Sequence, residues 1–160
     1  MRIIQSFLFL FITMNIFSQS PQSTNKHFWH SLKTIAEPQQ IWAVWTDVSN
    51  WYEWDTGLKA AELKGFFELG AKGSITSLEG RKSKFKIVAY EAGRSYTFRT
   101  NLPLAKLYVK RYLEEKNGTI YFTHEVWFKG LAASLFAKRF GSQFRELLPQ
   151  VMENIRQRVE

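Results

Sequence analysis

Two side chains in the second half of the chain, Arg111 and His124, have the chemistry that a functional site needs. An imidazole titrates near neutral pH and can move a proton, whereas a guanidinium is a permanent cation that binds carboxylates and phosphates. The dipeptide Asn117-Gly118 lies midway between them and is typical of a two-residue turn that joins antiparallel strands. In that hairpin Arg111 lies directly opposite His124, on a face otherwise composed of Leu, Val and Phe.

The pair allows two interpretations. In the first, both side chains extend to the rim of the sheet or are satisfied by backbone groups, and their role is structural. In the second, they form a polar patch in an apolar cavity. Because an unpaired buried charge is costly, that cavity would hold an acidic or hydrogen-bonding ligand group, or a carboxylate such as Asp55 or Glu62. Arg111 would then keep His124 neutral, and His124 could act as a general base.

A single register of this hairpin gives both faces a consistent chemistry. With Lys116 opposite Thr119, alternation predicts one apolar face and one face of matched charges and aromatic pairs. The pairs expected on the first face are Leu113–Phe122, Arg111–His124, Val109–Val126 and Leu107–Phe128, and those on the second are Tyr112–Thr123, Lys110–Glu125 and Tyr108–Trp127. The first face is therefore expected to turn toward the core.

The last thirty residues, Leu131 to Glu160, form the element that must cover this face. Apolar residues recur there at steps of three and four, which is the period of one helix face. They are Leu135, Phe136, Phe140, Phe144, Leu147, Leu148, Val151, Ile155 and Val159. Such a stripe, about 40 Å long, is too large to leave in water, so residues 27–129 must wrap it. We predict an α+β domain in which a curved antiparallel sheet of about seven strands grips a long C-terminal helix.

Turn residues divide the rest of the chain into short elements. Pro38 is expected to open a short helix over residues 39–47, and Ser49-Asn50 to cap a further turn that holds Trp51 and Trp54. Strands are expected over residues 27–35, 58–64, 73–79, 82–91, 95–101, 106–116 and 119–128. In the strand over residues 82–91, lysines alternate with other side chains and are expected on the solvent face.

Composition excludes several kinds of site. The chain has no cysteine, which removes disulfides, thiolate zinc sites and cysteine nucleophiles. His27 and His30 fall on opposite faces of a strand and cannot chelate one ion together, and no phosphate-binding glycine loop occurs. The net charge of +8 favours anionic partners, but no run of five like charges and no nucleic-acid recognition motif is present. We expect no metal, no cofactor and no nucleic-acid partner. The sequence sets no oligomeric state.

The N-terminus has the pattern of a secretory signal. An apolar run of about fifteen residues follows Arg2, which is short for a membrane-spanning helix of about 20. Cleavage after Ser18 is preferred, because cleavage after Ser20 would leave Pro21 as the first residue. This predicts a signal peptide over residues 1–18, a flexible lead-in over 19–26 and one domain over 27–160. The protein would be periplasmic or extracellular with no stable membrane anchor, or else tethered by an uncleaved signal.

The segment IWAVWTDVSNWYEWDTGLKAAELKGFFELGAKG resembles the front half of the SRPBCC (START-like) superfamily, in its polyketide cyclase/dehydrase and lipid-transport branch. The shared features are a helical [IV]-W-x-x-x-T-D, a W-x-x-W pair, an E-L-x-G and an F-x-x-G-x-x-G, in that order. The later GTIYFTHEVWFKG is similar to the penultimate strand of the family, and Pro149 is placed as in many members. The resemblance implies a helix-grip fold with a cavity between sheet and terminal helix. Trp45 departs from the family, where a smaller residue is usual, and would narrow or partly fill the cavity.

These observations support three functional hypotheses. The first is an exported protein that encloses a hydrophobic small molecule, lipid-like or aromatic, while Arg111 and His124 orient its polar end. The second is a cyclase- or dehydratase-type enzyme with His124 as catalytic proton shuttle. The third is an interaction module with a filled core that uses the Tyr108–Trp127 face. The candidate ligand-binding residues are Trp51, Trp54, Phe85, Val109, Arg111, His124, Val126, Phe128, Phe136, Phe140 and Phe144.

Overall fold

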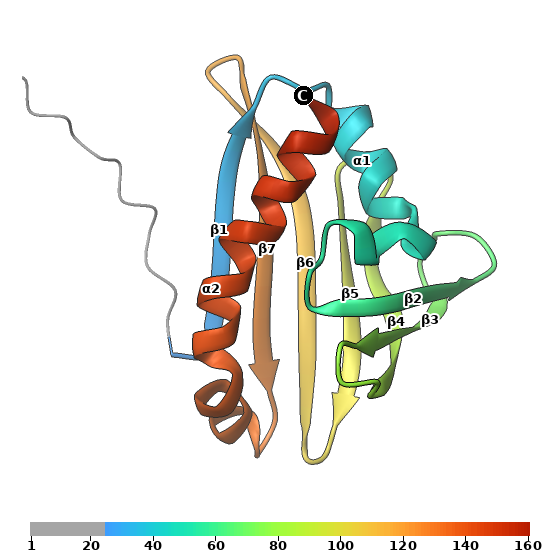
Figure 1. The fold of residues 1–160 in the computed structure, drawn as a ribbon, viewed down its shortest axis with the longest axis vertical. Helices are drawn as coiled ribbons and strands as arrows, with labels where there is room; N and C mark the ends of the chain where they lie inside the picture. Colours follow the sequence, from blue (N-terminus) through green and yellow to red (C-terminus); the bar gives the residue numbers. More distant parts are fainter. Residues whose placement is uncertain (1–24) are drawn as a thin grey trace, which may run out of the picture.

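A computed structural model describes residues 25–160, which form one seven-stranded antiparallel sheet and a long C-terminal helix (Figure 1). In chain order the elements are β1 (His27–Thr34), α1 (Pro38–Thr46), the 3₁₀ helix η1 (Val48–Glu53), β2 (Leu58–Lys64), β3 (Lys72–Ser77), β4 (Lys82–Glu91), β5 (Ser95–Leu102), β6 (Ala105–Lys116), β7 (Thr119–Lys129) and α2 (Ala133–Val159). The predicted α+β helix-grip architecture is confirmed. The predicted signal peptide and most of the lead-in lie outside the described residues.

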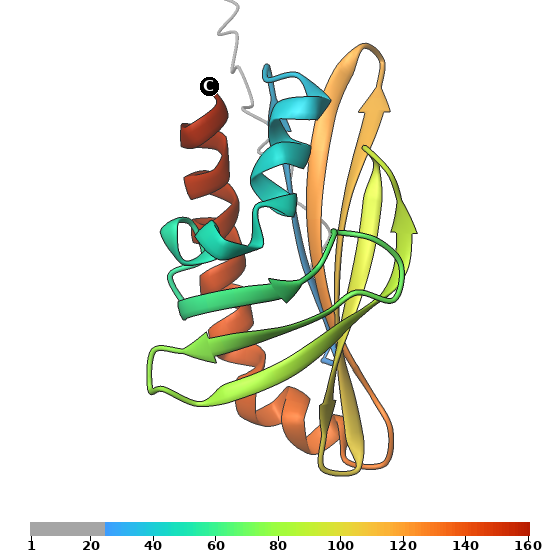
Figure 2. The ribbon, with the colours of Figure 1, turned by 90° about the vertical axis from the view of Figure 1, so that its right-hand side faces the viewer.

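The strand order across the sheet is β1-β7-β6-β5-β4-β3-β2. The sheet curves around α2, which runs along its concave side (Figure 2). Strands β2 and β3 cross from the rest of the sheet toward this helix. The short helices α1 and η1 lie beside α2 on that same side. The concave space between sheet and helices therefore holds the core.

The register of the β6–β7 hairpin agrees with the prediction at every expected pair. Lys116 lies opposite Thr119, Arg111 opposite His124, and the remaining pairs follow in step. Asn117 takes a positive φ of 52° and Gly118 one of 73°, as a two-residue hairpin turn requires. The local turn therefore fixes which side chains of both strands face α2.

The face of α2 that meets the sheet differs from the predicted stripe in its first half. Leu135 is 67% exposed, so its assignment to the buried face is wrong. The buried positions there are Ala133, Ala137 and Gly141, spaced four apart, and a Cβ on Gly141 would lie 2.8 Å from the ring of Phe28. Small residues let the helix approach the sheet closely, and this rotates the larger side chains to the flanks.

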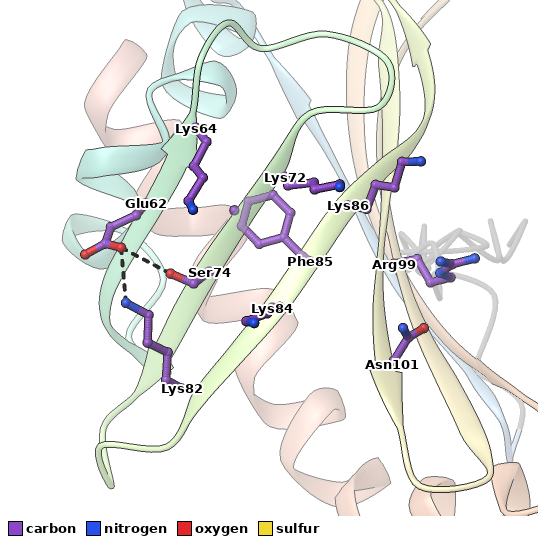
Figure 3. Close-up of a pocket in the computed structure, with 11 residues that line it drawn as sticks. Glu62, Lys64, Lys72, Ser74, Lys82, Lys84, Phe85, Lys86, Arg99 and Asn101 are labelled. Atoms are coloured by element: carbon purple, nitrogen blue, oxygen red, sulfur yellow. Dashed lines mark hydrogen bonds and ion pairs between the residues drawn. The ribbon is translucent and has the colours of Figure 1, made fainter.

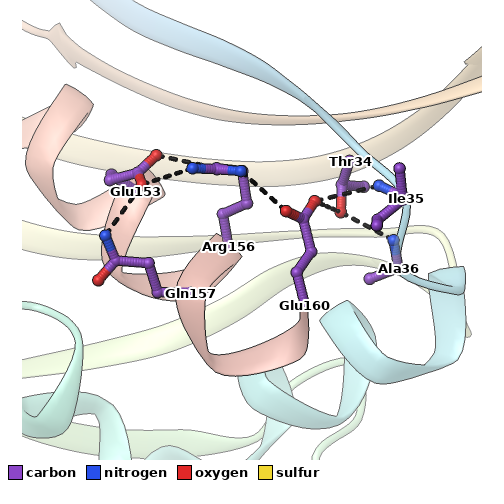
Figure 4. A network of polar contacts seen from close by, with 7 residues as sticks. All are labelled: Thr34, Ile35, Ala36, Glu153, Arg156, Gln157 and Glu160. Carbon is purple, nitrogen blue, oxygen red and sulfur yellow. Dashed lines mark hydrogen bonds and ion pairs between the residues drawn. The ribbon is translucent and has the colours of Figure 1, made fainter.

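The end of α2 is tied to the end of β1 by a polar network (Figure 4). The Glu160 carboxylate accepts hydrogen bonds from Thr34 Oγ1 at 2.8 Å and from the Ile35 backbone N–H at 3.1 Å. Arg156 bridges Glu160 at 2.8 Å and Glu153 at 2.7 Å. These contacts hold the helix in its position along the sheet.

Gly73 on β3 is required by a close approach inside the sheet. A Cβ at this position would lie 2.3 Å from the Phe85 ring and 2.3 Å from the Glu62 carbonyl oxygen. Neither the backbone nor a packed ring can move away cheaply, so Gly73→Ala should lower the free energy of unfolding by about 2–3 kcal/mol. Chemical denaturation checks this value. Ser74→Ala, the next residue on the same strand, serves as control and should cost less than about 1 kcal/mol; equal effects of the two changes would contradict the assignment.

Candidate ligand-binding cavity

A cavity of about 170 Å³ lies between the sheet and α2. Its walls come from η1 and the segment after it, from strands β2, β3, β5, β6 and β7, and from α2. Most of the lining is aliphatic or aromatic, and the polar side chains in the lining are Asp55, Arg111, His124 and Gln143. An apolar chamber with a few converging polar groups is the usual form of a small-molecule site.

Arg111 is the charged side chain at the centre of this arrangement. It is only 2% exposed, and its guanidinium carbon lies 4.6 Å from the Trp51 ring centroid and 4.7 Å from that of Trp54. Its Nη1 donates a hydrogen bond to the Tyr96 hydroxyl, whereas its Nε has no hydrogen-bond partner among the described residues. The indole faces stabilise the buried cation, but they leave one of its donors unsatisfied.

Tyr96 completes the support beneath Arg111. Burial raises the pKa of Tyr96 to about 12, although Arg111 opposes that shift. The phenol therefore stays neutral, accepting from Arg111 and donating to the Trp45 carbonyl at 3.4 Å. The same carbonyl accepts a hydrogen bond from Trp51 Nε1 at 3.0 Å. The Trp45 carbonyl oxygen thus holds both Trp51 and Tyr96, two of the side chains that contact the guanidinium.

Asp55 faces the same cavity without forming a direct ion pair with Arg111 in the described part of the chain. Burial raises the pKa of Asp55, while the positive charge of Arg111 and a hydrogen bond from the Gly57 backbone N–H, at 3.1 Å, oppose that rise. Because burial favours the protonated, neutral form of this carboxyl group, Asp55 offsets the charge of Arg111 only weakly.

His124 is 4% exposed and lies directly opposite Arg111 on β6 and His30 on β1. Burial, and after it the charge of Arg111, lowers the pKa of His124 well below its ordinary value. The imidazole is therefore neutral near pH 7, and its Nδ1 has no partner among the residues described. The interpretation in which Arg111 and His124 reach the rim of the sheet is wrong, because both are buried and line the cavity.

The structure brings six of the eleven predicted ligand-binding residues to the cavity wall, namely Trp51, Val109, Arg111, His124, Val126 and Phe144. The other five do not line it. Trp54 packs beside Trp51 and covers the guanidinium, and Phe85 stacks on Trp51 within the core. Phe128, Phe136 and Phe140 form an aromatic cluster near the start of α2, which meets the cavity wall through the contact between Phe128 and Phe144.

Trp45 does not narrow the cavity, contrary to the expectation from the sequence. It is fully buried and packs on Tyr96 and Phe122, behind the cavity lining. Sequence reasoning missed Gln143 as a lining residue. Its position four residues before Leu147, which also lines the cavity, is a helical spacing that could have indicated it.

The family model described as polyketide cyclase/dehydrase and lipid transport matches residues 32–160. The chain belongs to this family. Residues 32–160 span β1 to α2, so the match contains the whole cavity wall, Arg111 and His124 included. No curated protein matches the chain.

Solved structures with the same fold include proteins of several kinds. A hypothetical protein from Helicobacter pylori superposes with a TM-score of 0.71 at 9% identity, covering 100% of this chain and 99% of that one. The di-domain ARO/CYC StfQ from the steffimycin biosynthetic pathway gives 0.67 at 8% identity, covering 84% and 51%. Norcoclaurine synthase from Thalictrum flavum, in complex with dopamine and hydroxybenzaldehyde, gives 0.62 at 14% identity, covering 84% and 86%. At such identities these likenesses concern the fold alone.

Residues 25–160 lack the features of two other kinds of site. In this part of the chain no three His, Cys, Asp or Glu side chains cluster in a way that could hold a metal ion. Over the same residues no helix has both the length and the apolar character needed to cross a membrane.

The depressed pKa of His124 makes the stability of the fold depend on pH. The folded protein keeps His124 neutral, whereas the unfolded chain protonates it near its ordinary value of 6.5. The unfolded state therefore binds more protons below pH 6.5. The free energy of unfolding should fall on acidification by up to about 1.4 kcal/mol per pH unit, until the folded-state pKa is reached.

Chemical denaturation of wild type and His124→Gln between about pH 5 and 8 measures this contribution. The wild type should lose stability below pH 6.5 faster than the variant does. The two proteins share every other titratable group, so the difference between their slopes belongs to His124. Identical slopes for wild type and His124→Gln would show that folding does not lower the pKa of His124.

Proposed function

We propose that this protein binds a compact small molecule with an apolar body and an anionic or hydrogen-bond-accepting head group. The observation that carries the proposal is the buried Arg111, which lines an otherwise apolar cavity and has an unpartnered Nε. A guanidinium in that position binds carboxylate or carbonyl oxygens through directed hydrogen bonds. The neutral His124 adds a second polar contact on the adjacent strand.

The cavity volume limits the ligand size. An apolar cavity of about 150 Å³ in a protein core holds a benzene molecule, so about 170 Å³ suits one ring or a short acyl chain. This favours the aromatic member of the predicted ligand class over a long-chain lipid. Burying roughly 150–250 Å² of such a ligand would contribute about 4–6 kcal/mol before the costs of association.

Export is a further part of the proposal. The apolar run after Arg2 and the small residues that follow it support a secretory signal cleaved after Ser18, with a membrane-tethered form as the alternative. N-terminal sequencing of the mature protein tests it. A first residue of Gln19 is expected, whereas an intact Met1 would overturn cleavage.

Arg111 should discriminate ligands by their head group. Benzoate and toluene share one ring, so their affinities, measured by calorimetry, separate the carboxylate contact from apolar burial. Arg111→Met keeps a long side chain but removes the hydrogen-bond donors. The affinity for benzoate should fall at least tenfold, because a charged hydrogen bond contributes about 1.5–3 kcal/mol. The affinity for toluene should change little. Arg139→Met on the exposed side of α2 is the matched control and should change neither.

Two results would contradict this proposal. Equal losses of benzoate and toluene in Arg111→Met would mean that Arg111 is only structural. Native mass spectrometry of wild type gives the second test, since a discrete bound mass that vanishes on denaturation is expected. A ligand-free mass, together with no binding of benzoate, toluene or dodecanoate, would leave the cavity without a ligand.

A cyclase- or dehydratase-type activity is the second candidate, and a specific observation favours it. His124 is neutral, buried and has a free Nδ1 inside the cavity, which suits a general base. The solved structures of like fold include an ARO/CYC protein, named for such chemistry. The filled-core interaction module is disfavoured, because it required that no cavity be present.

His124→Gln separates binding from catalysis. If the protein only binds, ligands extracted from wild type and from the variant should have the same mass, and their affinities should differ less than about tenfold, the worth of one neutral hydrogen bond. If His124 transfers a proton in a dehydration, wild type should release a product lighter by one water, whereas the variant should keep the intact compound. Mass spectrometry of the extracts distinguishes these outcomes.

A further inference from the structure

Four basic residues form a continuous row across the outer face of the sheet, on strands β2, β3, β4 and β5 (Figure 3). Lys64 lies opposite Lys72, Lys72 opposite Lys86, and Lys86 opposite Arg99. They are far apart in the sequence, so no run of like charges reveals them. The row exists only because the strand registers bring the four positions into line.

This row works against the stability of the sheet. Directly opposed residues in neighbouring strands have Cβ atoms about 4.5–5.5 Å apart, and like charges at that distance repel. None of the four residues makes an ion pair within the described part of the chain. The adjacent Glu62 is already engaged by Lys82 at 3.1 Å and by Ser74 at 3.3 Å. The charge of Lys64 is one of the causes that lower the pKa of Glu62, so this carboxylate partly offsets one end of the row, while the other three cations have no ion-pair partner among the described residues.

The row lines a hollow rather than a flat face. The hollow has a volume of about 710 Å³, about four times that of the inner cavity, and six basic side chains and a single carboxylate line it. A concave surface lined by one sign of charge concentrates the potential and raises the local concentration of counter-ions. The shape favours a discrete anion over a flat membrane surface.

The donors in the hollow suit phosphate groups. Arg99 is half-buried, lines the hollow and makes no ion pair with a described residue, so its guanidinium can bind phosphate oxygens. The lysines supply compact charges, and Asn101 adds a neutral donor. Four strands at a spacing of about 4.8 Å put the ends of the row about 14 Å apart, which is more than one phosphate can span.

We propose that this hollow binds a multiply phosphorylated anion, either a free oligophosphate or the polyphosphorylated head group of a lipid. Single-stranded nucleic acid fits less well, because such sites add exposed aromatic rings on which bases stack. Phe85, the aromatic residue in the lining, is only 3% exposed. The row lies on the opposite side of the sheet from the inner cavity, and the two linings have no residue in common.

Calorimetry of the full chain with tripolyphosphate at physiological ionic strength tests the proposal. The double change Lys72→Gln and Lys86→Gln removes the two middle charges of the row. The control, Lys33→Gln with Lys138→Gln, removes two exposed lysines elsewhere and has the same net charge as the row variant. Wild type should bind, the row variant should lose at least tenfold in affinity, and the control less than twofold. Without ligand, the row variant should melt at a higher temperature than wild type, because a repulsion has been removed.

Three results would overturn the proposal: no binding by wild type at that ionic strength, equal losses in the two double variants, or tighter binding of a single-stranded oligonucleotide than of tripolyphosphate. Sedimentation with phosphatidylcholine vesicles, with and without a polyphosphorylated phosphoinositide, identifies the source. Co-sedimentation that requires the phosphoinositide and the intact row supports a lipid head group. Its absence, with tripolyphosphate bound, supports a soluble oligophosphate. Benzoate binding should be the same in all these variants. The proposal for the inner cavity and the proposal for the outer hollow are therefore tested separately.

Discussion

The structure depends on keeping the guanidinium of Arg111 inside the space between the sheet and α2. Removing a charge from water costs several kcal/mol unless other groups replace the solvent. Here the faces of Trp51 and Trp54, at 4.6 and 4.7 Å, and the hydroxyl of Tyr96 replace it. The short helix η1 sits between α1 and β2 to bring both indoles to that point. The W-x-x-W pair of η1 and its C-terminal end therefore surrounds one cation.

The same cation determines the state of its neighbours. Its field helps to lower the pKa of His124 and limits the rise in the pKa of Asp55. An incoming ligand would meet a fixed positive charge, a neutral imidazole and a carboxyl group that burial favours in its protonated form. That combination suits a hydrogen-bond-accepting or anionic head group, and it keeps a proton donor and a proton acceptor within one chamber.

The sheet separates two environments that differ in chemistry and size. Its concave side, against α2, holds a small apolar cavity of about 170 Å³, and its outer side holds a larger cationic hollow of about 710 Å³. Phe85 contributes to the wall of the hollow and stacks on Trp51, which lines the cavity. The Phe85 ring also occupies the space that a Cβ at position 73 would need, which explains why β3 has a glycine there.

The sequence by itself determined the elements whose signals are local. The Asn117-Gly118 turn and strict alternation fixed the β6–β7 register, and with it the juxtaposition of Arg111 and His124, because both signals act within a few residues. The period of the last thirty residues likewise determined a long helix gripped by a sheet. Tertiary structure alone decided which side of α2 meets the sheet. The small residues Ala133, Ala137 and Gly141 pack against the sheet there, and the larger Leu135 is exposed.

Only the tertiary structure decided the cavity volume, the exclusion of Trp54 and Phe85 from its wall, and the basic row on the outer face. The connection between β2 and β3 spans residues 65–71, and registers shift at Leu58/Ala60 and Ile87/Ala89. Alternation cannot predict how two strands pair across a loop of that length or past a bulge. Each of these features displaces every later residue pair by a number of residues that the sequence does not give. The alignment of Lys64, Lys72, Lys86 and Arg99 is set by the packing of the whole sheet.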